Sequence, residues 1–147
     1  MANPESIETI IRLASMRQIN AAIDYLHRGD FECAITLAGA GEGMLPQTDN
    51  PHFLQKVRAL AAALPETEEG AKGPNDYINW LKHGTLTKGG PRIENARITE
   101  FEVIVAIWRA ITKFKAVYVT VDADRTSQML GFANWAKTHL QNAKNSN

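Results

Sequence analysis

The sequence predicts an all-α fold, a bundle of five to six helices in a single domain over residues 1–147. Apolar residues recur at helical spacing in five segments, so each segment has one face to bury against the others. Helix start and stop signals separate these segments from one another. A chain of 147 residues is also long enough to bury about two-thirds of its unfolded surface in one core.

The first helix is predicted to run from Glu5 to Arg28, about 24 residues. Asn3 and Pro4 precede it as a cap and a first-turn proline. Gly29 ends it, because glycine takes the left-handed backbone conformation without strain. The apolar stripe of this helix comprises Ile7, Ile10, Ile11, Ala14, Ile19, Ala22, Ile23 and Leu26.

The second helix follows Asp30, whose carboxylate is expected to accept a free backbone N–H, and it ends at Pro46. The two helices form a hairpin over residues 5–45. Glycines in the second helix permit the close approach of a neighbour. They are Gly39, Gly41 and Gly43. Glu42 lies between two of them, and a carboxylate on an otherwise apolar helix has to reach water or find a partner.

Three further segments lead to the middle of the chain. A third helix is predicted over residues 50–65, followed by a charged loop over residues 65–73. A short fourth helix covers Asn75–His83, and its expected core contacts are Tyr77, Ile78 and Leu81. Residues 84–97 form a second loop, of a length that is usually mobile or functional inside a compact domain.

Thr99 and Glu102 form a capping box before a helix over residues 99–119. This helix is apolar around most of its circumference, so we expect it to be central. The last helix begins near Thr126, and a polar tail over residues 141–147 ends the chain. Its expected buried face comprises Met129, Leu130, Ala133, Ala136 and Leu140.

Two short segments also fit strands and leave an α/β alternative open. Val117–Val121 is rich in β-branched residues, and Cys33–Ala38 would be a strand before glycines. Only these two candidates exist, whereas a parallel sheet normally needs more strands. We therefore prefer the all-α prediction.

Composition narrows the classes of partner. Sixteen basic and sixteen acidic residues balance, so net charge does not support a nucleic-acid partner. Cys33 is the single cysteine, which excludes an internal disulfide. The first residues lack the pattern of a signal peptide, and no apolar run approaches the ~20 residues that span a bilayer. We expect a cytoplasmic protein with no membrane partner.

No cofactor or metal is predicted. The glycines of residues 39–43 match neither the phosphate-binding loop of nucleotide hydrolases nor the dinucleotide-binding fingerprint. The four histidines, at positions 27, 52, 83 and 139, form no Glu-x-x-His or His-x-x-x-His pair. A metal centre in a helical bundle would normally need such a pair.

Five polar residues are candidates for a shared cleft. They are Glu42, Asp76, Asn79, Lys82 and His83. Lys82 supplies a cation and His83 a group that exchanges a proton near neutral pH, which suits a small polar or anionic ligand. His83 also stands at the end of its helix, where it would stabilise the helix dipole instead. Both interpretations stay open.

Two family resemblances add to this. Tyr25 with Gly29-Asp30-Phe31 is similar to the hinge of a tetratricopeptide repeat, although no second copy follows at the 34-residue period. More broadly, the long first helix, the Gly-Asp turn, ITLAGAGEGML and DYINWLKHG resemble small bacterial proteins related to HEPN domains. That resemblance implies a bundle of four or five helices, often dimeric, of the kind found in toxins and RNA-cleaving effectors. Active HEPN members carry an arginine four to six residues before a histidine, and none of the four histidines here has one.

The functional prediction is a non-enzymatic bundle that assembles with itself, as a homodimer, or with a protein partner. The bare face of Gly39 and Gly43 and the apolar circumference of residues 101–111 indicate such assembly. The alternative is a HEPN-like RNA-directed enzyme or toxin component that uses His83 and its neighbours.

Overall fold

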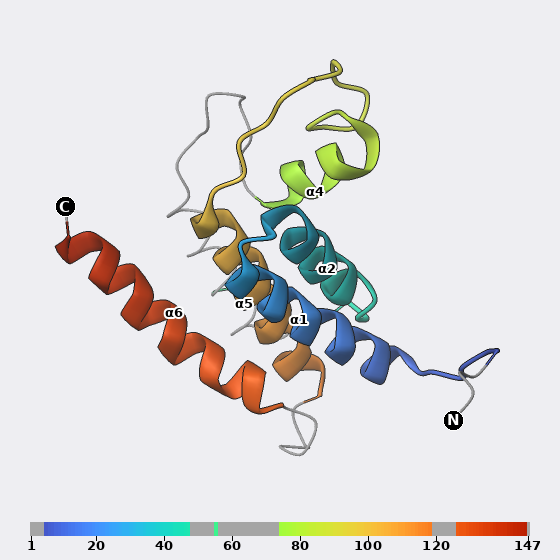
Figure 1. Cartoon of the computed structure of the whole chain (residues 1–147). Coiled ribbons are helices and arrows are strands. Elements are labelled where there is room, and N and C mark those ends of the chain that lie inside the picture. The colour runs from blue at the N-terminus through green and yellow to red at the C-terminus, as the bar shows by residue number, and fades with distance from the viewer. Residues whose placement is uncertain (1–4, 48–54, 56–73, 119–125, 147) are drawn as a thin grey trace.

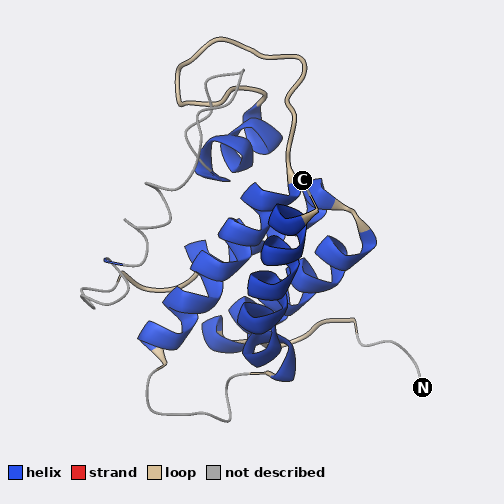
Figure 2. Cartoon of the chain, turned by 90° about the vertical axis from the view of Figure 1, so that its left-hand side faces the viewer, coloured by secondary structure: helices blue, strands red, loops and turns tan. Residues whose placement is uncertain are grey.

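The computed structural model describes residues 5–47, 55, 74–118 and 126–146. Within these ranges the chain is helical and contains no strand, which confirms the all-α prediction (Figures 1 and 2). The helices are α1 (Ile11–Arg28), α2 (Phe31–Gly43), α4 (Pro74–His83), α5 (Glu100–Val117) and α6 (Ser127–Asn145). None of them is long and apolar enough to cross a membrane. Of the predicted helix over residues 50–65, the structure describes Gln55 alone, and that residue is helical.

The α1–α2 hairpin turns at Gly29, as predicted. Gly29 has φ 81° and donates its N–H to the Leu26 carbonyl at 3.0 Å, and the Asp30 N–H reaches the Tyr25 carbonyl at 2.9 Å. These bonds satisfy carbonyls that the end of α1 would leave free. The prediction that the Asp30 carboxylate caps α2 is wrong, because that side chain makes no capping hydrogen bond.

The side of α2 that carries the glycines packs against other helices of the same chain. The Ser15 hydroxyl donates to the Gly41 carbonyl at 2.8 Å, and a Cβ atom at Gly41 would lie 3.2 Å from the Ser15 carbonyl oxygen. At Gly39 a Cβ atom would lie 2.5 Å from Cδ1 of Ile78. The neighbours that approach closely are therefore α1 and α4, which explains two of the glycines.

Helix α5 is the centre of the bundle, as predicted. It contacts α1, α2, α4 and α6, and its residues from Glu102 to Ile107 are all buried. The Thr99–Glu102 capping box is present at its start. The apolar circumference that the sequence shows is thus covered by other helices of the same chain.

Two predicted helix details are wrong. Residues 5–10 are not helical, and α1 begins at Ile11 after Ile10 in an extended conformation. This segment is rich in β-branched residues and buries nothing against the bundle, so a helix there would have neither propensity nor packing to support it. In α6 the residues Met129, Phe132 and Ala136 are buried, whereas Leu130 and Ala133 are exposed.

The α/β alternative is also wrong where the structure describes it. Cys33–Ala38 lies within α2, and Val117 is the last residue of α5. Residues 119–121 lie outside the described residues. At the other end of the chain, α6 continues through most of the predicted polar tail, to Asn145.

Candidate functional site

Glu42 finds its partner on α5. Its Oε2 accepts a hydrogen bond from Nε of Arg109 at 2.7 Å, and the two side chains are only 16% and 14% exposed. Nη2 of Arg109 also donates to Oδ1 of Asn75 at the start of α4. Nζ of Lys113, one turn further along α5, lies 3.4 Å from the Glu42 carbonyl oxygen. The C-terminal end of α2 is therefore held by two cations of α5, which suits the negative end of a helix dipole.

The proposed polar cleft does not assemble around this pair. Helices α2 and α4 run in opposite directions. Along α4, Asn75 lies beside Glu42 at the end of α2, and Ile78 packs against Gly39. Further along, Leu81 lines a cavity together with residues 29–33, at the start of α2. His83 ends α4, about 12 Å along the helix axis from Asn75 at 1.5 Å per residue. The structure thus separates Glu42 from Lys82 and His83.

Asn79 has a structural role. Its Nδ2 donates to the Thr85 carbonyl oxygen at 2.7 Å, so the amide fastens the following loop to α4. Nε1 of Trp80 donates to the Ile93 carbonyl oxygen at 2.6 Å and fastens the same loop further along. Asp76 is half-buried, whereas Lys82 and His83 are exposed on the last turn of α4. The predicted cleft residues are therefore divided between an internal ion pair, a loop anchor and a solvent-facing helix end.

Arg109 is the residue that the sequence analysis missed. It is the one arginine of a helix that is otherwise largely apolar. A charge in such a helix has to be paired when the helix is central. A carboxylate on the apolar α2, Glu42, thus points to an oppositely charged residue on the most buried helix.

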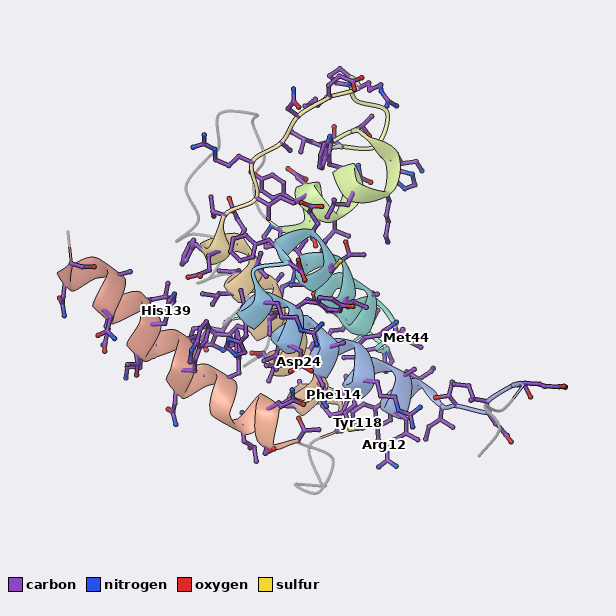
Figure 3. The ribbon with its side chains drawn as sticks, in the orientation of Figure 1. Arg12, Asp24, Met44, Phe114, Tyr118 and His139 are labelled. Carbon is purple, nitrogen blue, oxygen red and sulfur yellow. The ribbon has the colours of Figure 1, made fainter. Side chains whose placement is uncertain are left out.

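A second cluster lies where α6 meets α1 and α5. The ring of Trp135 stacks on His139, with centroids 4.8 Å apart, and meets the ring of His27 edge-on at 4.6 Å. Nε2 of His139, a residue on α6 that Figure 3 shows, is paired with Oε1 of Glu100. These contacts fasten α6 to the bundle. Within the described ranges, no three His, Cys, Asp or Glu residues lie close enough to hold a metal ion.

One end of the α1–α2 hairpin is apolar and exposed. Among the residues that the structure describes, four of the five exposed large hydrophobic residues lie in or beside the start of α1 and the end of α2. They are Ile7 at 72%, Ile10 at 53%, Ile11 at 52% and Met44 at 37%, and we call them the apolar end. Residues 5–10 form an arm that extends away from the helices, and Figure 3 shows Met44 and Arg12 at the same end of the hairpin (Figures 1 and 3).

No protein-family model, curated protein or solved structure matches the chain. The functional argument therefore depends on the described residues themselves.

Proposed function

We propose that this protein is an assembly module, a helical bundle that forms a homodimer through its apolar end. The observation that carries this proposal is the exposure of Ile7, Ile10 and Ile11, which are each more than half exposed. Full burial of an isoleucine side chain contributes ~1.5–3 kcal/mol, so contact between two such ends is a substantial driving force. Grouped exposed apolar residues of this kind mark interaction sites in soluble proteins.

A second copy of the chain fits this surface by charge. The arm is acidic, with Glu5 and Glu8, whereas the first turns of α1 are basic, with Arg12 and Arg17. In a two-fold symmetric contact, a residue i that meets a residue j of the partner implies that j also meets i, so the acidic arm of each protomer can lie against the basic turns of the other. The net charge of zero adds no long-range repulsion between copies.

The HEPN-like relationship is part of the same proposal. The long helical hairpin and the central α5 agree with a bundle of that kind, and HEPN-like bundles are often dimeric. RNA-directed chemistry at His83 has no comparable support, because neither Glu42 nor Arg109 lies at that end of α4. We place the module in the cytoplasm, since its single cysteine, Cys33, suits a reducing compartment.

The experiment is sedimentation equilibrium of the full chain at ~20–50 μM, the range of ordinary dimer affinities. We expect the wild-type chain to be a dimer. The double variant Ile7→Asp/Ile10→Asp should be a monomer with unchanged helical content, because both residues precede α1 and contribute nothing to the core. Leu130→Asp is the matched control, since Leu130 is 56% exposed on α6, away from the apolar end.

The outcomes separate the proposal from its alternatives. A monomeric wild-type chain at these concentrations would refute self-assembly and leave a different protein as the partner. A dimer that survives Ile7→Asp/Ile10→Asp but dissociates with Leu130→Asp would move the interface to α6. Either result overturns the assignment of the apolar end.

A further inference from the structure

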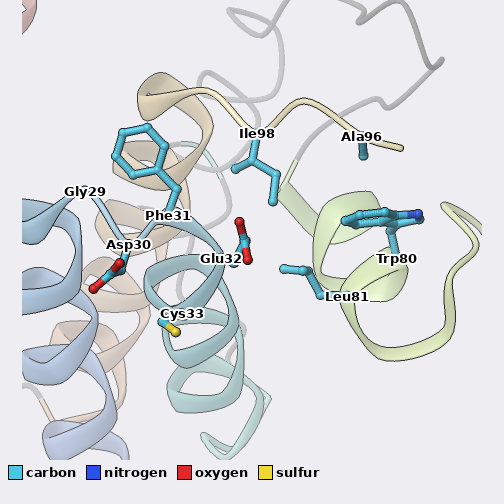
Figure 4. Close-up of a pocket in the computed structure, with 9 residues that line it drawn as sticks. All are labelled: Gly29, Asp30, Phe31, Glu32, Cys33, Trp80, Leu81, Ala96 and Ile98. Atoms are coloured by element: carbon cyan, nitrogen blue, oxygen red, sulfur yellow. The ribbon is translucent and has the colours of Figure 1, made fainter. Parts of the chain in front are cut away.

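The hinge of the hairpin borders a cavity of about 410 Å³ (Figure 4). Residues 29–33, the turn and the first turn of α2, form one wall. Trp80 and Leu81, in the last turns of α4, form the second wall. Ala96 and Ile98, in the segment that leads to α5, form the third. Three separate parts of the sequence therefore meet around one space.

The walls are fixed without any ligand. The Gly84 N–H donates to the Trp80 carbonyl oxygen at 2.7 Å, and the Ile93 N–H donates to the Gly84 carbonyl oxygen at 2.9 Å. Together with the bond from the Trp80 indole to Ile93, these contacts hold the loop after α4 against that helix. The loop was expected to be mobile or functional, and in the structure it is fastened. A preformed cavity spares a ligand the cost of ordering its site.

The described lining residues combine apolar walls with carboxylates and include no Lys, Arg or His. In Figure 4 the Glu32 carboxylate lies between α2 and the side chains of Leu81 and Ile98, whereas the Asp30 carboxylate is on the far side of the turn. Among the described residues, none forms a hydrogen bond or ion pair with Glu32. One carboxylate is thus available at the mouth of an aliphatic and aromatic space.

An anion does not suit this cavity, although the N-terminus of α2 borders it. Asp30 and Glu32 already place two negative charges at that helix end, where they complement the dipole and repel further anions. A cation in the cavity gains from the Glu32 carboxylate instead. The apolar walls favour a hydrocarbon stem behind the charge, as in side chains that keep a charged head on an apolar body.

We propose that this cavity binds a primary ammonium group carried on a short aliphatic chain, with Glu32 as its anionic partner and Leu81 and Ile98 against its stem. The ammonium donates hydrogen bonds to the Glu32 carboxylate, and the stem displaces water from the apolar walls. A free alkylamine and a lysine side chain of another protein share this chemistry. The site lies at the hinge of the hairpin, so its occupation does not depend on the homodimer.

The test is an NMR titration of the ¹⁵N-labelled full chain with n-butylammonium chloride. We expect saturable shifts of the amide signals of residues 29–33 and of Trp80 and Leu81, with a dissociation constant in the millimolar range. Neutral n-butanol should bind at least about 10-fold more weakly, because it lacks the charge-assisted hydrogen bond. Glu32→Gln should weaken n-butylammonium binding by a similar factor.

Glu94→Gln is the matched control, since Glu94 is a solvent-exposed glutamate outside the cavity, and its binding curve should equal that of the wild type. Leu81→Lys tests the geometry independently. The introduced lysine on α4 would pair with the Glu32 carboxylate and abolish n-butylammonium binding, although Glu32 itself is unchanged.

N-acetyl-lysine methylamide distinguishes a lysine side chain from a free alkylamine as the ligand. Binding about 10-fold tighter than that of n-butylammonium assigns the site to a lysine side chain, and equal binding assigns it to a free amine. Equal binding of n-butylammonium to the wild type and Glu32→Gln, or shifts located elsewhere, overturns the proposal.

Discussion

Removal of the ion pair between Glu42 and Arg109 should lower the stability of the fold. Both side chains are more than four-fifths buried, and a single 2.7 Å hydrogen bond joins them. Removing one partner of a fully buried pair costs ~3–5 kcal/mol, because the remaining charge is left uncompensated. Residual exposure and the second acceptor of Arg109, Asn75, reduce that cost. We expect Glu42→Gln and Arg109→Met each to lower the free energy of unfolding by ~2–3 kcal/mol.

The double variant Glu42→Gln/Arg109→Met completes a thermodynamic cycle. It should be about as stable as either single variant, so the coupling energy between the two side chains should equal one single loss, ~2–3 kcal/mol. The measurement is urea denaturation followed by circular dichroism, with the slope of each transition compared to confirm that the unfolded state is unchanged. Lys113 keeps its bond to the Glu42 carbonyl in every variant, because that bond uses the backbone.

The chain supplies its own control for this cycle. Arg92 and Glu94 form an ion pair of similar length, 2.9 Å, but their side chains are 73% and 74% exposed. Exposed pairs contribute ~0–1 kcal/mol, so Arg92→Met and Glu94→Gln should show little coupling. If the Glu42–Arg109 coupling is as small as that of the exposed pair, water reaches Glu42 in solution and the reasoning from burial is refuted.

Two further predictions concern the hairpin. In the proposed dimer, Glu8→Arg and Arg17→Glu should each weaken association through like-charge contacts, and the double variant should restore it. Sedimentation equilibrium measures the association of all three variants. If the double variant does not restore association, the acidic arm does not pair with the basic start of α1. Within α2, Gly43→Ala should raise the free energy of unfolding by up to ~1 kcal/mol because a Cβ atom there meets nothing within 4 Å. Gly41→Ala should lower the free energy of unfolding by ~1–2 kcal/mol, because its Cβ atom would crowd the Ser15 carbonyl. Urea denaturation measures both substitutions. Equal effects would show that α1 and α2 separate easily.

Most of the fold is predictable because its signals are local. The Gly29 turn, the Thr99–Glu102 capping box and the Thr126 cap each depend on residues within a few positions of one another. The Thr126 hydroxyl accepts the Met129 N–H at 3.2 Å, as a residue at that position should. The start of α1 was misjudged for a different reason. The apolar stripe continues through Ile7 and Ile10 in the sequence, but helix formation there also needs a surface to pack on, which no local pattern reports.

The candidate site was harder to predict because it depends on how helices run past one another. The residues from Asp76 to His83 lie on one helix, and Glu42 was grouped with them because it is also polar. Helix α4 runs opposite to α2, however. That direction brings Asn75, not His83, to Glu42. Glu32 could not be predicted for the same reason. In the sequence it is only an acidic residue in the first turn of a helix. The other walls of its cavity come from α4 and from the segment before α5, which are distant in the sequence.

The two proposed sites lie at opposite ends of the same hairpin, and this separation has a consequence for the proposed dimer. The apolar end adjoins the last turn of α2, whereas the Glu32 cavity adjoins its first turn, and the 13 residues between span ~20 Å. A two-fold contact between apolar ends therefore leaves both cavities of the proposed dimer open. A partner with two suitably spaced ammonium groups would then bind the dimer more tightly than the monomer, by effective concentration and without a new contact. Ile7→Asp/Ile10→Asp should remove that gain for a bivalent amine while leaving the affinity for n-butylammonium unchanged.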